Sequence, residues 1–254
     1  MAAVPPTDRP AGDDTLAQPD GYSFDQCIAE FFAKTSVTRP NCDARAKELV
    51  GGDVVPFDIQ STCSYAVYAG PKLEYIVQFR LKPVRLKVEN AVLAKEVYGS
   101  LAPDVSFYEE LGSEVDGKET IFPVVMTRAP GRTHLLVHGP PWNTQQRFDQ
   151  RENLLTDMAR FFALSWRQPA TIEEGHRTSL RQTYLRELRI LLTSLPERFH
   201  VLVQHCIDSM DAIFSLPMVF LNPDLRSGNL MVDEMSCHLT GVATGLRLGL
   251  PPSA

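Results

Sequence analysis

The residues best suited to chemistry lie near the end of the chain, in the segment 222–229 with the sequence NPDLRSGN. The segment follows the apolar run 217–221, which is typical of a buried strand. An Asp followed five residues later by an Asn, on a loop leaving a strand, places a proton acceptor beside a metal ligand. Asp224 would accept the proton of a substrate hydroxyl, and Asn229 would hold a magnesium ion that bridges nucleotide phosphates. The spacing therefore predicts phosphoryl transfer, although Asn-Pro-Asp is also common turn chemistry.

The composition limits the class of protein. The 254 residues suit one large domain or two small lobes, and 44% apolar with 22% charged residues is ordinary globular composition. A net charge of -6 argues against a nucleic-acid partner. Five cysteines without C-x-x-C spacing predict reduced thiols rather than a disulfide or metal framework. No apolar run approaches the ~20 residues that span a bilayer, so the sequence predicts a cytoplasmic protein without a membrane partner.

The first half of the chain reads as helices followed by strands. Residues 1–20 are rich in Pro, Asp and Ala and predict a disordered leader. The capping pattern Ser23–Gln26 opens a predicted helix, and a second helix is expected from Asn41 to the glycines at 51–52. Asp116-Gly117 predicts a hairpin turn. Strands are predicted at 54–59, 65–68, 75–81, 105–108 and 120–126, with a helix at 89–98.

The second half reads as mainly helical. Apolar stripes predict helices through Leu155–Trp166 and Leu180–Leu195 and a third from Pro196 to the residue before Pro217. Phe161, Phe162 and Trp166 are predicted to be core residues, and the runs 230–232 and 239–242 predict a hairpin. A sheet, a hinge near 128–131 and a helical half together predict two lobes around a ligand cleft.

These motifs resemble the aminoglycoside phosphotransferase family, in the divergent form common in filamentous fungi, and hence the protein-kinase-like fold. The resemblance covers residues 54–242 and is most specific at 216–242, where Leu-Pro, the Asp-x-x-x-x-Asn spacing, Leu-Met-Val-Asp and Leu-Thr-Gly-Val follow the family order. Supporting stretches are 75–80, 98–103, 125–131 and 163–166. The resemblance implies an α+β, two-lobed fold with an antiparallel-sheet N-lobe in 21–128 and a helical, incomplete C-lobe in 129–254.

The resemblance also implies cofactors and roles. ATP and Mg²⁺ would be the cofactors, and the acceptor would be a hydroxyl group of a small molecule. Asp224 would be the catalytic base and Asn229 the metal ligand. The residue that touches the nucleotide phosphates would lie at Gln78, which carries no charge, or at Arg80, which points the same way two residues on.

Two further regions of the cofactor site follow from the same resemblance. Glu89 would form an ion pair with the basic residue, and Met126 to Ala129, including Arg128, would be the hinge whose backbone contacts adenine. Structural alternatives remain for both charged residues: Glu at a helix start is favoured by the helix dipole, and Arg80 equally suits a strand-end surface position. His134 and His138 are four residues apart, but Gly-Pro-Pro at 139–141 interrupts any helix there, so a metal role is not favoured.

Three departures from the family pattern bear on activity. Asn222 stands where the family has His, and the segment 60–64 replaces a Gly-rich phosphate loop. Thr244 stands where a metal-binding Asp is expected, and no acidic residue follows Glu234. The sequence therefore leaves two functions open: an ATP-dependent phosphotransferase of impaired activity, truncated or out of frame soon after Val242, or a non-catalytic binding module. A protein kinase is disfavoured because no activation segment follows the loop, and the oligomeric state is not specified.

Overall fold

The computed structural model describes residues 23–137, 143–171, 173–221 and 225–242, so the leader predicted for 1–20 lies outside it. The first part of the chain contains α1 (Phe24–Ala33), α2 (Arg39–Val50), β1 (Asp53–Pro56), β2 (Ser64–Gly70), β3 (Tyr75–Leu81), α3 (Val88–Tyr98), β4 (Val105–Phe107) and β5 (Ile121–Thr127). The second part contains β6 (Arg132–Thr133), α4 (Gln145–Trp166), α5 (Glu174–Ser194), α6 (His200–Asp208), α7 (Met210–Ser215), β7 (Leu230–Val232) and β8 (Leu239–Val242).

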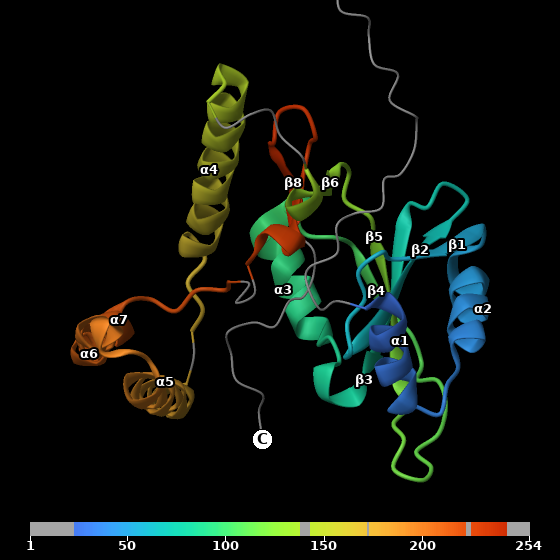
Figure 1. The fold of residues 1–254 in the computed structure, drawn as a ribbon, viewed down its shortest axis with the longest axis horizontal. Coiled ribbons are helices and arrows are strands. Elements are labelled where there is room, and N and C mark those ends of the chain that lie inside the picture. The colour runs from blue at the N-terminus through green and yellow to red at the C-terminus, as the bar shows by residue number, and fades with distance from the viewer. Residues whose placement is uncertain (1–22, 138–142, 172, 222–224, 243–254) are drawn as a thin grey trace, which may run out of the picture.

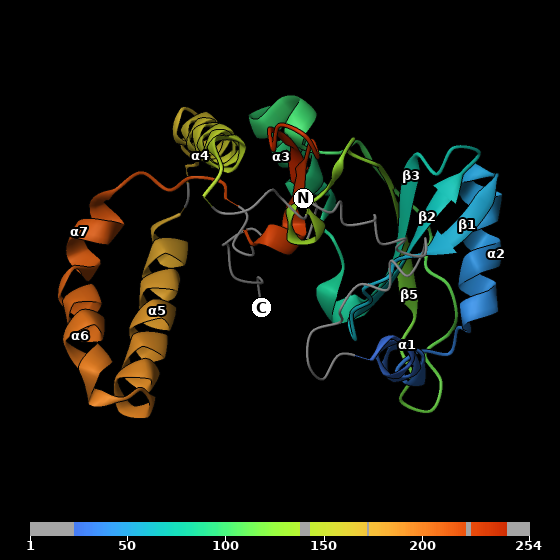
Figure 2. The same ribbon diagram turned by 45° about the horizontal axis from the view of Figure 1, so that its top comes forward.

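An antiparallel sheet in the order β1-β2-β3-β5-β4 forms the centre of the first part. Alternate side chains of β3 enter different cores: Val77 and Phe79 pack with residues of α1 and α2, whereas Ile76 packs with residues of α3 and α4. Figure 2 shows the sheet between α2 on one side and α3 on the other. Gln78 and Arg80 share the register of Ile76, so they belong to the α3 side of the sheet.

Local capping signals fix the two N-terminal helices. The Ser23 hydroxyl accepts the backbone N–H of Gln26, which confirms the predicted start of α1. The second helix begins at Arg39, two residues before the prediction, because Thr38 and Asn41 form the capping box and Pro40 fits the first turn. The predicted hairpin turn is also present, with positive φ at both Asp116 and Gly117.

Helix α4 packs against α3 with a different face from the predicted one. Phe161 is 1% exposed and stacks on Tyr98 with ring centroids 4.1 Å apart. Phe162 and Trp166 are 46% and 54% exposed, so the core prediction was right only for Phe161. Apolar residues occur on several sides of this helix, and the face that meets α3 is one residue away from the predicted stripe.

The helices α5, α6 and α7 form a group beyond the C-terminal end of α4, farther from the sheet than α4 itself (Figure 1). The single predicted third helix is interrupted at Ser209 and preceded by a 3₁₀ turn, Glu197–Phe199. The bridge between Pro169 and Val219 brings together the two ends of the segment that contains α5, α6 and α7. An antiparallel sheet followed by a mainly helical part confirms the predicted α+β class and its division into a sheet part and a helical part. Within the described ranges, no helix is long and apolar enough to cross a bilayer.

Candidate functional site

The structure describes most of the predicted site residues but not the predicted base. Asp224 and Asn222 fall in 222–224, and Thr244 falls in 243–254, all outside the described residues. The remaining predicted residues lie on the α3 side of the sheet, on the segment that leaves β5, and on the turn before β7. Their geometry can be built from these three places.

Gln78 and Arg80, the two alternatives for the phosphate contact, touch each other. The Arg80 Nη1 donates to the Gln78 Oε1 at 2.8 Å, and its Nε donates to the Val84 carbonyl at 2.7 Å. Both side chains are half-buried. The Gln78 amide therefore orients the guanidinium, and the positive charge of the pair comes from Arg80.

The predicted partner of this basic residue lies apart from it. Glu89 is exposed in the first turn of α3, where a carboxylate is favoured by the helix dipole. In the parts of the chain that are described, no ion pair joins Glu89 to Arg80. The pairing of these two residues stays a prediction.

The predicted hinge leaves the end of β5. Met126 is buried and lies between Ile76 of β3 and Val105 of β4. The next two backbone N–H groups are used within the sheet part, since Thr127 donates to the Asp104 carbonyl at 3.0 Å and Arg128 donates to Glu74 at 2.9 Å.

The side chain of Arg128 turns toward the hairpin of β2 and β3. Its guanidinium carbon lies 4.3 Å from the centroid of the Tyr68 ring, and its Nη1 donates to the Leu73 carbonyl at 3.3 Å. The backbone N–H of Ala129 makes no hydrogen bond among the described residues. Of the hinge residues 127–129, Ala129 therefore offers the unused backbone donor.

The hinge packs directly against the hairpin formed by β7 and β8. Gly131 has a φ of 85°, and a Cβ built there would lie 2.1 Å from the Val232 carbonyl oxygen. A Cβ at Gly241 would lie 2.6 Å from the Cβ of Ala129. The Thr240 hydroxyl donates to the Pro130 carbonyl. Only glycine permits this approach of the two backbones.

Asn229 ends the 3₁₀ turn Ser227–Asn229 and is half-buried. Thr133, just after the hinge, donates its hydroxyl hydrogen bond to the carbonyls of Ser227 and Gly228, at 3.1 and 3.0 Å. The Asn229 N–H donates to the Arg226 carbonyl at 2.8 Å. The turn that carries the predicted metal ligand is thus held to the hinge by Thr133, a contact that no sequence spacing indicated.

The turn between β1 and β2, where the family resemblance leads us to expect a Gly-rich loop, is closed by its own polar groups. Gln60 is buried, its Nε2 donates to the Ala66 carbonyl at 2.8 Å, and its Oε1 accepts the Ala66 N–H at 3.0 Å. The Ser61 hydroxyl accepts the N–H of Cys63 at 3.1 Å. These bonds fix the turn beside the Ser64 end of β2.

A row of side chains along one face of α4 donates hydrogen bonds to the turn that connects β7 and β8, at the opposite end of that hairpin from Asn229. The Gln150 Nε2 donates to the Met235 carbonyl at 3.0 Å, and the Asn153 Nδ2 donates to the Ser236 carbonyl at 2.9 Å. Asp157 continues this row, because residues three and four apart share a helix face. The row was not recognised in the sequence, where these side chains resemble an ordinary solvated face.

Asp157 makes the tightest contact of this row. Its Oδ2 is 2.7 Å from the His238 Nδ1 and accepts the Leu239 N–H at 3.1 Å, while its Oδ1 accepts from Arg160 at 2.9 Å. Burial alone would raise the pKa of the Asp157 carboxyl, but the hydrogen bonds from His238 and Leu239 outweigh it and lower the pKa. The row Gln150, Asn153 and Asp157 therefore fixes the hairpin that begins at Asn229.

The prediction of a buried strand at 217–221 was wrong: the segment forms one isolated bridge, between Val219 and Pro169, because no strand of the described residues pairs with it along its length. The segment is nevertheless anchored between the two parts of the molecule. The hydroxyls of Tyr98 in α3 and Ser165 in α4 both donate to the carbonyl of Phe220. All three residues are buried, and burial raises the pKa of the Tyr98 hydroxyl. The segment carrying Asp224 therefore starts from a fixed point.

The described residues gather no set of three or more His, Cys, Asp and Glu side chains that could hold a metal ion. Asn229 could supply one amide oxygen to Mg²⁺, which prefers oxygen ligands. Burial, with a smaller contribution from Arg147, lowers the pKa of His134, and His138 lies outside the described residues.

Comparison with known proteins gives structural matches only. No protein-family model matches the sequence, and no curated protein matches it. One similar crystal structure is that of a protein from Ralstonia eutropha described as a candidate aminoglycoside phosphotransferase. The TM-score is 0.40 and the sequence identity is 16%. The match covers 79% of this chain but only 62% of the length of that protein. The structure of a type VIII aminoglycoside-3'-phosphotransferase is similar with a TM-score of 0.39 and 18% identity, over 82% of this chain and 77% of that one. Both matches are to the family that the sequence motifs resemble.

Proposed function

We propose that this chain binds ATP between its sheet part and its helical part and transfers the γ-phosphoryl group to a hydroxyl of a small molecule. The observation that carries the proposal is that the segment just after the hinge contacts both the turn that bears Asn229, through Thr133, and strand β7, through the close approach of Gly131 to Val232. Nucleotide phosphotransferases need the adenine contact and the metal ligand on one rigid frame.

The roles follow from the chemistry of each group. The Ala129 N–H would donate to the adenine ring, and the Arg80 guanidinium, oriented by Gln78, would contact the phosphates. Asn229 would supply an oxygen ligand to Mg²⁺, which when bound neutralises phosphate charge. Asp224 would accept the proton of the acceptor hydroxyl.

Nucleotide binding without transfer is the second candidate function. It is favoured by Thr244, a hydroxyl at the position where the family resemblance calls for a carboxylate. A hydroxyl binds a divalent cation against phosphate charge far less strongly than a carboxylate. Loss of a principal electrostatic component costs on the order of 10²–10³ in rate.

Thermal unfolding with ATP, with and without Mg²⁺, tests the nucleotide site. Binding at a hundredfold excess over Kd stabilises the folded chain by about 2.7 kcal/mol. Arg80→Gln should reduce the stabilisation by ATP, and Asn229→Ala should remove its dependence on Mg²⁺. Arg186→Gln, an exposed position on α5, is the matched control and should change neither. Absence of any shift with ATP in the wild-type chain would refute both candidate functions.

Formation of ADP from MgATP, with kanamycin as a hydroxyl-bearing acceptor, separates the two candidates. If the chain is a transferase, the wild type should form ADP. Asp224→Asn should abolish ADP formation, while the stabilisation by ATP should persist. Stabilisation by ATP without ADP formation supports binding alone.

A further inference from the structure

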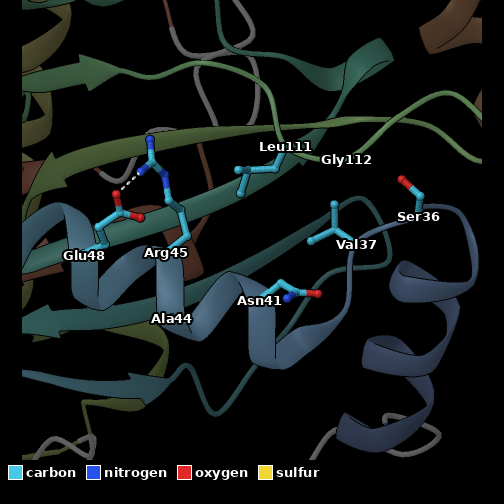
Figure 3. A pocket seen from close by; sticks show the side chains of 8 residues that line it. All are labelled: Ser36, Val37, Asn41, Ala44, Arg45, Glu48, Leu111 and Gly112. Atoms are coloured by element: carbon cyan, nitrogen blue, oxygen red, sulfur yellow. Dashed lines mark ion pairs between the residues drawn. The ribbon is translucent and has the colours of Figure 1, made fainter.

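A pocket of about 450 Å³ lies between α2 and the loop that connects β4 to β5 (Figure 3). Helix α2 packs on the face of the sheet that carries Val77 and Phe79, opposite to the face of Gln78 and Arg80. The pocket is therefore separate from the proposed nucleotide site. None of the roles proposed above uses it.

The walls of the pocket are partly apolar. Val37, Ala44 and Leu111 contribute aliphatic surface. Gly112 closes one end: its φ is 87°, and a Cβ there would lie 2.6 Å from the Ser36 Oγ and 2.7 Å from the Val37 Cγ2. The loop approaches this closely only because the position is a glycine.

Two hydrogen-bond donors that line the pocket have no partner among the described residues. The Arg45 Nη1 pairs with the Glu48 Oε1 at 2.7 Å, but the Arg45 Nε is buried without a partner. The Oδ1 of Asn41 accepts from the N–H and the hydroxyl of Thr38, whereas its Nδ2 donates to no group among the described residues. A buried donor without an acceptor destabilises its surroundings, so an acceptor that reached the Arg45 Nε would bind favourably, and the exposed Asn41 Nδ2 could donate to the same acceptor.

The ion pair between Arg45 and Glu48 can be broken at little cost in free energy. The Glu48 side chain is 68% exposed, so its attraction to Arg45 is screened by water. The Nε–H and one Nη of a guanidinium form a planar fork that matches a carboxylate. When Arg45 turns over the pocket toward such a ligand, Glu48 can remain solvated.

We propose that this pocket binds a small molecule that carries one carboxylate on an apolar body. The carboxylate accepts from Arg45 and Asn41, and the body lies against Val37 and Leu111. A phosphate dianion fits less well, because a single guanidinium would face both that charge and the nearby Glu48.

Backbone amide chemical shifts, measured with benzoate as the probe, test this proposal. We expect saturable shifts confined to residues 36–48 and 111–112. Benzamide, the neutral isostere, should bind at least about tenfold more weakly, since a hydrogen-bonded charge is lost. Arg45→Gln should weaken benzoate binding by a similar factor, and Arg186→Gln should leave it unchanged.

A second variant keeps the test independent of folding at Arg45. Asn41→Asp places a negative charge at an exposed position of the first turn of α2, where acids are tolerated, and should abolish benzoate binding. The absence of shifts in these segments at millimolar benzoate would overturn the proposal, as would equal affinities for benzoate and benzamide. Asn229→Ala should not affect benzoate binding, which separates this pocket from the nucleotide site.

Discussion

Replacement of Asp157 by Ala should loosen the hairpin that begins at Asn229. The change leaves the buried Leu239 N–H without its acceptor, which costs about 1–3 kcal/mol, and removes the contact with the half-exposed His238, worth about 1 kcal/mol. The Arg160 side chain is 71% exposed, so its pair with Asp157 adds almost nothing. The expected loss is about 2–4 kcal/mol of unfolding free energy, or roughly 4–16 °C in Tm.

Urea and thermal unfolding of the variants measure this loss. Asp157→Asn keeps one oxygen for the Leu239 N–H and should lose only about 1 kcal/mol. Arg160→Ala is the matched control and should change the free energy by less than about 0.5 kcal/mol. A loss below about 0.5 kcal/mol for Asp157→Ala, or an equal loss for Arg160→Ala, would refute the reasoning. The stabilisation by MgATP should fall in Asp157→Ala as well, because the hairpin carries Asn229.

The contribution of Asp157 should also depend on pH. Its folded-state pKa is lowered, so its stabilisation is fully present above the ordinary carboxyl pKa near 3.9 and is lost as the pH falls through the folded-state pKa. The difference in unfolding free energy between the wild type and Asp157→Asn should therefore shrink below about pH 4. A difference that persists unchanged to pH 2, roughly, would show that the charge is not involved.

Two further changes test the frame of the site. Gly131→Ala should cost at least about 2 kcal/mol of unfolding free energy, because φ is positive and the new Cβ meets a β7 carbonyl, whereas Gly175→Ala, in open space on α5, should be neutral or stabilising. Ser165→Ala and Tyr98→Phe should each cost about 1 kcal/mol, measured by urea unfolding. The double variant should cost more than their sum, because the Phe220 carbonyl then loses both donors; strict additivity would contradict the shared anchor.

Some elements could be predicted closely because their signals are local. The strand Tyr75–Leu81 and the hairpin strands Leu230–Val232 and Leu239–Val242 have the predicted bounds. Each is a short apolar run between polar or turn-forming residues, and these signals for the ends of a strand depend only on residues a few positions apart. The Asp116-Gly117 turn likewise depends only on two residues that tolerate positive φ.

Helix faces were less predictable. Leu155, Phe162 and Trp166 form an apolar stripe at helical spacing, yet they are exposed, and Phe161 on the neighbouring face is buried. Hydropathy locates an apolar face only where the rest of the helix is polar. In α4 the face that enters the core was selected by the position of α3 and its Tyr98 ring, which the sequence of α4 does not contain.

The sequence by itself determined the order of strands and helices and the spacing between Asp224 and Asn229, since these depend on residues close together in the chain. Only the tertiary structure decided which residues hold the turn that bears Asn229. Thr133 lies 94 positions before Ser227, and Gln150, Asn153 and Asp157 contact a hairpin more than eighty positions later. It also decided that Arg80 donates a hydrogen bond to Gln78, and that among the described residues no ion pair joins Arg80 to Glu89. Hydrogen bonds between distant segments depend on how the two parts pack, and no local pattern of residues encodes that packing.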